Sequence, residues 1–381
     1  MKTWIKKVFG DLYDRLIIMH KIRGEKKKFK DHRRIKILKS RNLTTKERKH
    51  VDELYKKCYG KKIPYVWHQY YSAYTGRFDV KYFPEHLYIP VFEWYMNNNK
   101  EYNTVFQDKN ILPLLANKVG IKTPEIVLSA CCGVVRDRAL NIISDLCDCK
   151  PLEDGVYFYK PSVQSGSGKD CYKIHVCNGL INGKNLEDFI IESGGDFVIQ
   201  KVLKCSKSIE KLYPDSVNTF RVISYIWDSQ IKVAPVIMRI GQGGSYLDNA
   251  HAGGIFIGVN NDGRLCKEAF TEFRDVFTLH PDTNIVFEGY LIENYEQVIE
   301  AAKVMHAVIP QVGIINWDFT INEDDEPVLI EANIENGSIW LAQIAHGKGI
   351  FGEDTEAILE WCSRMNHTRK SERERYRYGK L

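Results

Sequence analysis

The sequence predicts an α+β fold built from more than one lobe. Short runs of strand-forming residues alternate with helical patterns from about residue 101 onward, and polar turns between neighbouring runs favour antiparallel pairing. The chain has 381 residues, which is long for one compact domain, and 44% of them are apolar, which is enough for a large core. No internal repeat is present in this pattern.

Hydrophobic periodicity predicts the individual elements. Six segments are expected to be strands because they are rich in β-branched and aromatic residues: 156–160, 197–203, 219–227, 231–240, 313–321 and 328–333. Four segments have apolar residues three or four positions apart and are expected to be helices: 112–119, 185–192, 295–308 and 355–365.

The composition favours a cytoplasmic protein without a membrane span. The sequence holds no run of about 18 apolar residues, so no transmembrane helix is expected, and the N-terminus lacks the pattern of a signal peptide. The ten cysteines are scattered, and their spacings match no zinc-binding pattern. We therefore expect reduced thiols in the cytoplasm.

The N-terminal extension, residues 1–62, is strongly basic. It holds 22 Lys and Arg against 7 Asp and Glu, whereas the rest of the chain holds 32 against 42 and is mildly acidic. Residues 1–20 are expected to form an amphipathic helix, followed by a stretch at 21–41 that is rich in Lys and Arg. The apolar residues at helical spacing are Trp4, Ile5, Val8, Phe9, Leu12, Leu16 and Met19.

This extension has two interpretations that the sequence leaves open. An apolar stripe with basic flanks suits peripheral contact of residues 1–41 with anionic lipid at the inner face of the membrane. The same pattern is typical of a helix that packs on the body of the protein or on a partner chain. Nucleic-acid binding is not expected, because the extension interleaves few aromatic residues and carries no known binding motif.

The rest of the chain divides into four predicted parts. Residues 63–155 begin with an aromatic-rich segment, 63–100, that is expected to be core. Residues 156–205 are expected to form a small subdomain, and residues 206–368 a large one with a metal site. The tail, residues 369–381, holds six Lys and Arg and two Glu and is expected to fray.

The first segment that carries chemistry is a strand that ends at Lys160. A lysine at the end of a strand has a rigid base and can hold its ammonium group against phosphate oxygens. A small flexible loop follows, formed by Ser165, Gly166, Ser167 and Gly168. Glycines let backbone N–H groups approach phosphates closely, although this loop lacks the spacing of a P-loop. A hairpin turn beside a surface lysine explains the segment equally well.

The second segment is a hairpin with two carboxylates in apolar surroundings. Asp318 lies on its first strand, and Glu331 and Asn333 lie two residues apart on the second, so that their side chains point to one face. A buried carboxylate needs a compensating cation. Oxygen ligands without thiolate or imidazole favour Mg²⁺, which makes this hairpin a candidate metal site. Structural salt bridges are the alternative.

Arginine and histidine side chains between these two segments are candidate catalytic groups. Arg221 and Arg239 each lie inside an apolar strand-like run, where an arginine needs an acidic partner or an anion. The anion could be a transferred phosphoryl group, and the acidic partner could be a metal-binding carboxylate. His251 follows in a glycine-rich loop, where it could act as a base for an acceptor or be an ordinary loop residue.

Taken in order, these residues resemble the ATP-grasp superfamily. The series consists of Lys109, Lys160 with its Ser/Gly loop, the run 197–203, Arg221, Arg239 and the hairpin with Asp318, Glu331 and Asn333. Within the superfamily, the chain is similar over about residues 65–362 to the sugar-transfer-associated family found with polysaccharide-assembly genes. The resemblance implies an ATP-grasp fold, in which two α+β subdomains grip ATP, here with a helical, basic N-terminal extension.

The resemblance also implies positions for ATP and Mg²⁺. Lys109 would reach the α-phosphate, Lys160 the α- and β-phosphates, and the loop from Ser165 to Gly168 would cover the β- and γ-phosphates. The adenine would contact the backbone of a hinge formed by Gln200, Lys201, Val202 and Leu203. The superfamily often has an acidic residue where Gln200 stands, so this contact departs from the pattern. Mg²⁺ would bind Asp318, Glu331 and Asn333.

The implied activity is a carboxylate–amine or carboxylate–hydroxyl ligase that forms an acyl phosphate. Its substrate would be a small or sugar-linked molecule, and its role would lie in cell-surface polysaccharide biosynthesis. A carboxylate needs no base to attack ATP, which suits a sequence with no evident His–Asp pair. Two alternatives remain open: a kinase of a sugar or polyol hydroxyl, for which His251 would be the base, and a non-catalytic nucleotide-binding scaffold at the membrane surface.

Overall fold

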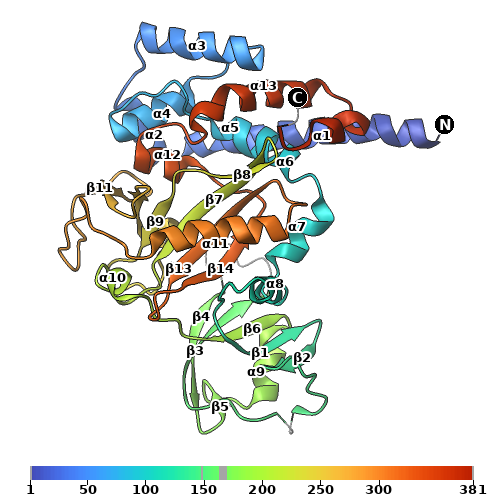
Figure 1. The fold of residues 1–381 in the computed structure, drawn as a ribbon, viewed down its shortest axis with the longest axis vertical. Helices are drawn as coiled ribbons and strands as arrows, with labels where there is room; N and C mark the ends of the chain where they lie inside the picture. The colour runs from blue at the N-terminus through green and yellow to red at the C-terminus, as the bar shows by residue number, and fades with distance from the viewer. Residues whose placement is uncertain (1, 147–148, 163–169, 380–381) are drawn as a thin grey trace.

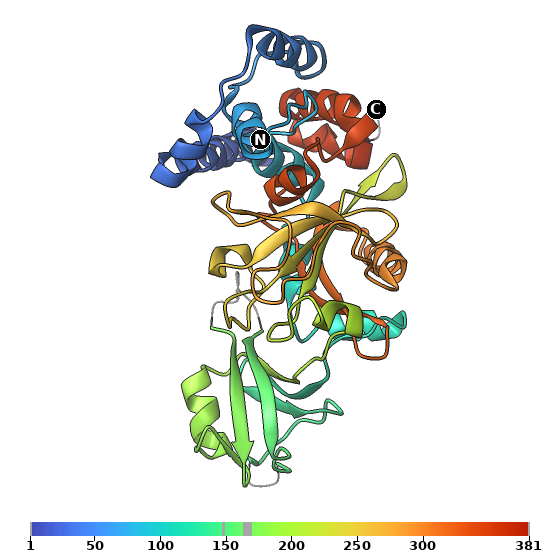
Figure 2. The same ribbon diagram turned by 90° about the vertical axis from the view of Figure 1, so that its left-hand side faces the viewer.

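The computed structural model describes residues 2–146, 149–162 and 170–379, without the side chains of residues 2–9. Its parts are stacked along one long axis (Figure 1). A layer of helices lies at one end, an eight-stranded sheet occupies the middle, and a six-stranded sheet lies at the other end. Figure 2 shows the same order from the side, with the six-stranded sheet farthest from the helical layer.

The helical layer is formed by the N-terminal extension, the aromatic-rich segment and the C-terminal helices. Its elements are α1 (Lys2–Lys27), η1 (Lys28–Lys30), α2 (His32–Lys39), α3 (Thr45–Tyr59), α4 (Val66–Thr75), α5 (Glu85–Leu87), the π-helix η2 (Tyr88–Glu93), α6 (Trp94–Met96), α12 (Trp340–His346), η6 (Gly352–Asp354), α13 (Thr355–His367) and η7 (Lys370–Gly379). Helix α3 begins with a capping box between Thr44 and Glu47 and ends at the left-handed Gly60.

Aromatic side chains form the core of this layer, which confirms the prediction for residues 63–100. Trp67, Tyr70, Tyr71, Tyr88 and Phe92 are each at most 1% exposed. They pack with residues of α3, α12 and α13 in one cluster. Burial of such large rings supplies most of the apolar area that this layer removes from water.

The six-stranded sheet has the strand order β2-β1-β6-β3-β4-β5. Its strands are β1 (Ile126–Cys131), β2 (Val134–Asp137), β3 (Gly155–Pro161), β4 (Tyr172–Cys177), β5 (Leu180–Ile181) and β6 (Phe197–Lys201), and α9 (Leu186–Ser193) packs against it. The sequence placed the beginning of this subdomain at residue 156. Strands β1 and β2 already belong to its sheet, because β1 pairs with both β2 and β6, so that boundary is placed too late.

The eight-stranded sheet has the order β12-β11-β10-β9-β7-β13-β14, and β8 pairs with β7. Its strands are β7 (Thr219–Trp227), β8 (Gln230–Val233), β9 (Ile237–Ile240), β10 (Ile255–Val259), β11 (Leu265–Phe270), β12 (Val276–Phe277), β13 (Ile314–Ile321) and β14 (Pro327–Asn333). Helix α11 (Tyr295–Val308) covers one face (Figure 1). The short helices α7 (Lys100–Gln107), α8 (Leu112–Lys118) and α10 (Lys207–Glu210) and the turn η5 (Ala250–Ala252) complete the description.

One predicted strand is interrupted. Residues 231–240 were expected to be continuous, but they form the end of β8 and the whole of β9, with residues 234–236 outside both strands. Pro235 lies at the break. Proline has no backbone N–H to donate to a sheet ladder, which explains why the strand stops and restarts there.

The C-terminal tail is ordered against the helical layer, so the prediction that it frays is wrong. The guanidinium of Arg373, a residue that is 5% exposed, contacts Asp14 of α1 at 2.5 Å. Trp361 donates its indole N–H to the carbonyl of Tyr376 at 2.6 Å, and Tyr378 donates its hydroxyl to the carbonyl of Pro310 at 2.7 Å. The buried carboxylate of Asp14 requires a cation, and the tail supplies it.

Candidate functional site

A cavity of about 640 Å³ lies between the two sheets. Strands β3 and β6 of the smaller sheet line one side, and strands β7, β9, β13 and β14 of the larger sheet line the other. The cavity brings together residues from distant parts of the sequence: Lys109, Lys160, Arg221, Arg239, His251, Asp318, Glu331 and Asn333. All of these are residues that the sequence singled out.

The hairpin of β13 and β14 places its three oxygen-bearing side chains together. Asp318 pairs directly with Glu331 across the ladder, and the register shifts immediately after Asp318. The side-chain amide of Asn333 donates to Asp318 Oδ2 at 3.3 Å and to Glu331 Oε1 at 3.2 Å. The three side chains therefore converge at one point of the cavity wall, as two-residue spacing and antiparallel pairing require.

Two arginines from neighbouring strands surround Asp318. Arg221 lies opposite Asp318 in the register of β7 and β13 and binds it through Nε at 2.6 Å and Nη2 at 3.1 Å. Arg239 of β9 contacts Asp318 Oδ2 at 3.1 Å and Asp248 at 3.5 Å, and donates to the hydroxyl of Thr219. The acidic partner that each arginine needs is thus Asp318, one of the proposed metal ligands.

These contacts fix the ionisation of Asp318. Burial raises its pKa, but the guanidinium groups of Arg221 and Arg239 overcome this effect and hold the pKa at about 2. Asp318 is therefore a carboxylate at any physiological pH. Asp248, which sequence reasoning did not single out, completes the network through Thr219, whose backbone N–H and hydroxyl both donate to it.

Two lysines approach Glu331 from the side of the smaller sheet. Lys109 is 8% exposed, and its Nζ lies 3.9 Å from Glu331 Oε2. Its backbone N–H donates to the carbonyl of Ser162, just after β3, which ties Lys109 to the strand that carries Lys160. Burial lowers the pKa of Lys160, and Glu331 opposes this shift. Burial and the charge of Asp318 raise the pKa of Glu331, and Lys109 opposes that shift.

The charged side chains that line the cavity favour the binding of a polyanion. The described side chains that line it provide seven Lys and Arg against six Asp and Glu: Lys109, Lys160, Lys173, Lys201, Lys204, Arg221 and Arg239, and Glu210, Asp215, Asp248, Asp318, Glu331 and Glu335. The balance is one positive charge in a cavity where water is partly excluded, and electrostatic interactions are stronger there than in bulk water. A triphosphate would bind in this field, and a divalent cation would reduce its excess negative charge.

The predicted hinge lines the cavity as well. Gln200, Lys201, Val202 and Leu203 all belong to its wall. The backbone N–H of Lys201 donates to the carbonyl of Glu125 at 2.9 Å, so this group is not available to an adenine. The predicted lid residues Ser165, Gly166, Ser167 and Gly168 lie outside the described residues.

His251 has a carboxylate partner that the sequence did not reveal. Its Nδ1 lies 2.8 Å from Glu272, and Glu272 also accepts from Arg34 of α2 at 2.9 Å. Burial raises the pKa of Glu272, but the hydrogen bond to His251 and the charge of Arg34 produce a net lowering. These three residues are far apart in the sequence, and no local motif connects them.

Two buried glutamates hold the loop that follows β14. Glu93 accepts from the backbone N–H of Asn336 at 2.8 Å and of Gly337 at 2.6 Å. Glu85 accepts from the backbone N–H of Ile339 at 2.9 Å and of Trp340 at 2.8 Å. The loop lines the cavity, so the helical layer fixes part of the cavity wall. Glu85 and Glu93 were not singled out from the sequence. The signal that could have found them is the presence of two acids within a stretch of apolar and aromatic residues, because a buried acid needs hydrogen-bond partners.

We expect Glu93, the last residue of η2, to make the stability of the folded protein depend on pH. Burial raises the pKa of Glu93 from 4.5 to about 8, so the folded state binds this proton more tightly than the unfolded state does. The wild-type protein therefore loses stability as pH rises from about 5 to about 8. Glu93→Gln cannot titrate, and the NH₂ group of its amide would face a backbone N–H donor in place of an acceptor oxygen. The variant should therefore be less stable than wild type at low pH, and the difference in Tm between the two proteins should narrow as pH rises. A gap that stays constant would refute this prediction.

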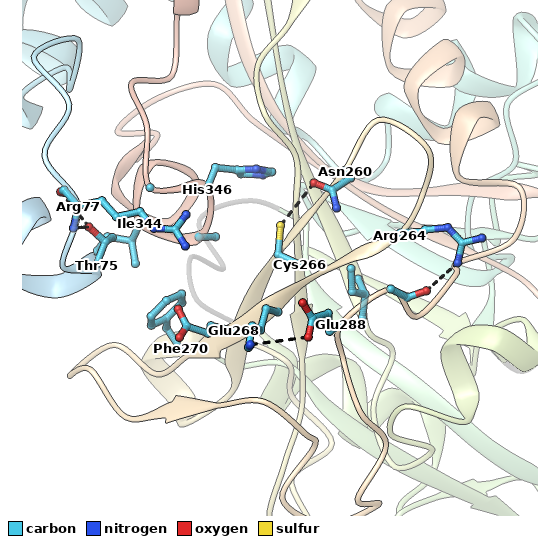
Figure 3. Close-up of a pocket in the computed structure, with 15 residues that line it drawn as sticks. Thr75, Arg77, Asn260, Arg264, Cys266, Glu268, Phe270, Glu288, Ile344 and His346 are labelled. Carbon is cyan, nitrogen blue, oxygen red and sulfur yellow. Dashed lines mark hydrogen bonds and ion pairs between the residues drawn. The ribbon is translucent and has the colours of Figure 1, made fainter.

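A second cavity, of about 320 Å³, lies at the β10–β11 hairpin (Figure 3). Lys267 is paired with Glu288 at 3.8 Å, and the ring of His346 bonds the carbonyl of Val236 at 2.7 Å. Burial raises the pKa of the thiol of Cys266, which keeps it protonated. A protonated thiol is a poor nucleophile, so we assign the chemistry to the larger cavity.

Two sheets thus enclose a cavity with lysines on one side and a carboxylate hairpin on the other. The model of the sugar-transfer associated ATP-grasp family matches residues 91–358. The chain therefore belongs to this family and has its fold.

Two of the solved structures that match this chain are amino acid ligases. The L-amino acid ligase from Bacillus licheniformis is 11% identical, with 69% of this chain and 49% of that chain covered and a TM-score of 0.39. The D-alanine–D-alanine ligase from Bacillus anthracis is 16% identical, with 69% of each chain covered and a TM-score of 0.36. The chain thus spans about half the length of the amino acid ligase. No curated protein matches the sequence.

Proposed function

We propose that the protein is an ATP- and Mg²⁺-dependent ligase that activates a carboxylate as an acyl phosphate and joins it to an amine or hydroxyl. The observation that carries this proposal is the convergence of Asp318, Glu331 and Asn333 opposite Lys109 and Lys160 in one cavity. The family's description suggests that the substrate is sugar-linked and that the role lies in cell-surface polysaccharide biosynthesis. We propose a cytoplasmic reaction because ATP is available there.

The hairpin residues fit a magnesium ion. Asp318 and Glu331 provide carboxylate oxygens, Asn333 provides an amide oxygen, and no thiolate or imidazole is among these three. Mg²⁺ prefers such oxygen ligands and completes its shell with water and phosphate. When bound, the ion would neutralise charge on the phosphates during phosphoryl transfer. Asn333 bonds both carboxylates and so orients them toward a common point.

The protein's own side chains would hold ATP and the transferred group. Lys160 and Lys109 would contact phosphate oxygens, and the hinge residues Val202 and Leu203 would flank the adenine. Arg221 and Arg239 would stabilise negative charge on the transferred phosphoryl group. Both arginines are held by Asp318, so their positions are set before the substrate binds.

The reaction divides into two steps with different needs. In the first, a carboxylate oxygen attacks the γ-phosphorus, the bond to the β-phosphate oxygen breaks, and ADP leaves; no proton moves. In the second, an acceptor attacks the acyl carbon, phosphate leaves, and the acceptor loses a proton. Because Nδ1 of His251 is engaged by Glu272, Nε2 would accept that proton.

The same pair favours one alternative, a kinase of a hydroxyl group. A hydroxyl must lose its proton to attack ATP, and the His251–Glu272 pair could accept it. The two functions differ in products. A ligase releases one phosphate for each ADP, whereas a kinase releases ADP and leaves the phosphate on the acceptor. Measuring ADP and free phosphate with amino acids and nucleotide sugars as substrates separates them, and Glu331→Ala controls for contaminating ATPases. If no mixture supports turnover, both proposals fail.

The two-step scheme predicts that His251 matters only for the acceptor. With the donor acid from that screen, His251→Ala should lower ligation by about a hundredfold or more. Trapping of the acyl phosphate by hydroxylamine should stay at the wild-type rate, because hydroxylamine needs no base. Glu272→Gln should have a ligation rate between those of wild type and His251→Ala, and it should shift the pH profile of ligation. Equal loss of ligation and trapping in His251→Ala would contradict the assigned role.

A further inference from the structure

Helix α1 has an inner face that is fixed to the protein. Asp14 is 1% exposed and binds Arg373 of the C-terminal tail, and Ile18 is buried in the core of the helical layer. Asp11 accepts from the backbone N–H of Lys370 at 2.7 Å, and Glu25 pairs with Lys28 at 2.7 Å. These contacts set the rotation of the helix about its axis, so they also decide which residues face outward.

The outer face of α1 is apolar. Leu12, Tyr13, Leu16 and Met19 are 51%, 59%, 52% and 45% exposed, and each is among the large apolar residues exposed to solvent. Positions 12, 16 and 19 follow helical spacing and form one stripe, with Tyr13 beside it. A stripe of neighbouring exposed apolar side chains differs from scattered surface leucines, because it marks a surface that binds something.

Charge on the helix is sorted between the two faces. From residue 10 to residue 27, the exposed cations are Arg15, Arg23, Lys26 and Lys27. Of the three acids of the same segment, Asp11 and Asp14 bind the C-terminal tail, and Glu25 is buried and pairs with Lys28. Within this described segment, the outer face therefore presents cations and apolar groups and no carboxylate.

We propose that the outer face of α1 docks on an anionic lipid surface. Leu12, Leu16 and Met19 would enter the boundary between headgroups and acyl chains, and the arginines and lysines would bind lipid phosphates and carboxylates. None of the helices in the described part of the chain is both long and apolar enough to cross a bilayer, so the contact is peripheral. Helix α1 lies in the layer opposite the six-stranded sheet, and its N-terminal part extends past that layer (Figure 1).

Charge complementarity favours a membrane over a second copy of the chain. Two copies that met through this face would bring the same cations together, and like charges repel. A lipid surface with phosphatidylserine supplies negative charge over a wide area without a matching shape. The proposal concerns binding only and does not depend on the ligase chemistry.

The test is sedimentation of the full-length protein with large vesicles, either of phosphatidylcholine alone or with one third phosphatidylserine. Wild type is expected to bind the anionic vesicles at least about tenfold better than the neutral ones, and less well at high salt. Leu12→Asp/Leu16→Asp should reduce binding to the anionic vesicles by about tenfold or more. Arg15→Glu/Arg23→Glu should reduce it by a similar factor.

Matched variants at exposed positions away from α1 serve as controls. Ile191→Asp changes a side chain of α9 that is 71% exposed, and Lys118→Glu/Lys150→Glu makes the same change in net charge as the arginine pair. Both controls should bind vesicles as wild type does, and all variants should keep the wild-type Tm because the changed residues are exposed. Equal binding by the α1 variants and the controls overturns the proposal. Loss of a dimer in light scattering, without loss of vesicle binding, would assign the face to a second copy and also overturn it.

Discussion

Glu331→Ala is expected to abolish ADP formation, by about a thousandfold or more, while the protein stays folded. Glu331 faces Asp318 across the hairpin, accepts from Asn333 and lies opposite Lys109. Without it, a magnesium ion would keep one carboxylate in place of two. Because burial and Asp318 already raise the pKa of Glu331, its removal relieves repulsion between carboxylates, so we expect little loss of Tm.

The control for this prediction lies on the same hairpin. Glu326 is an acid at the hairpin turn that pairs with Lys122 at 3.4 Å, near the surface. Glu326→Ala should form ADP at the wild-type rate. Lys160→Ala should resemble Glu331→Ala, with lost turnover and an intact fold, because Lys160 faces the same group of charges. Normal turnover in Glu331→Ala would remove the hairpin from the catalytic centre, and normal turnover in Lys160→Ala would remove Lys160 from it.

The hairpin was predictable because its information is local. Glu331 and Asn333 are two residues apart on a strand, and a polar turn joins that strand to the one with Asp318. Antiparallel pairing then leaves few registers, and apolar neighbours on both strands select the one that is observed. The strand lysine at position 160 was predictable for the same reason, as it ends a short β-forming run before a proline.

The contacts of His251 and Glu93 were not predictable, because their partners come from distant segments. His251 is held by Glu272, 21 positions away, and Glu272 by Arg34, 238 positions away. Glu93 contacts a loop that is more than 240 positions away in the sequence. The pairing of β10 with β11 brings His251 to Glu272, and the packing of the helical layer on the larger sheet brings Arg34 and Glu93 to their partners. Nothing in the local pattern of charges or apolar residues records either arrangement.

The orientation of the N-terminal helix also could not be predicted from the sequence alone. Its existence and its apolar stripe follow from periodicity, but periodicity does not say which face meets the protein. The buried Asp14 decides this, because its carboxylate requires a cation and the cation is Arg373, near the other end of the chain. The sequence therefore predicts an amphipathic helix, and only the structure shows that Leu12 and Leu16 face outward.

Asp318→Asn is expected to differ from Glu331→Ala by destabilising the fold as well as ending turnover. Asp318 is 1% exposed and neutralises the partly buried Arg221 and the buried Arg239. Removing its charge leaves Arg221 without its carboxylate partner and Arg239 with Asp248 alone, which costs about 3–5 kcal/mol. Because its pKa is held at about 2, the stabilisation from this carboxylate persists at neutral pH and is lost only as pH falls from about 4 through about 2.

A double-mutant cycle tests this reasoning through unfolding rather than activity. Arg221→Met combined with Asp318→Asn should be more stable than the sum of the two single losses predicts, because the double variant buries one fewer unpaired charge. The measured quantity is the free energy of unfolding in urea at neutral pH. If the two losses in the free energy of unfolding were strictly additive, Asp318 and Arg221 would not stabilise each other. The claim that Asp318 holds both arginines in place would then be wrong.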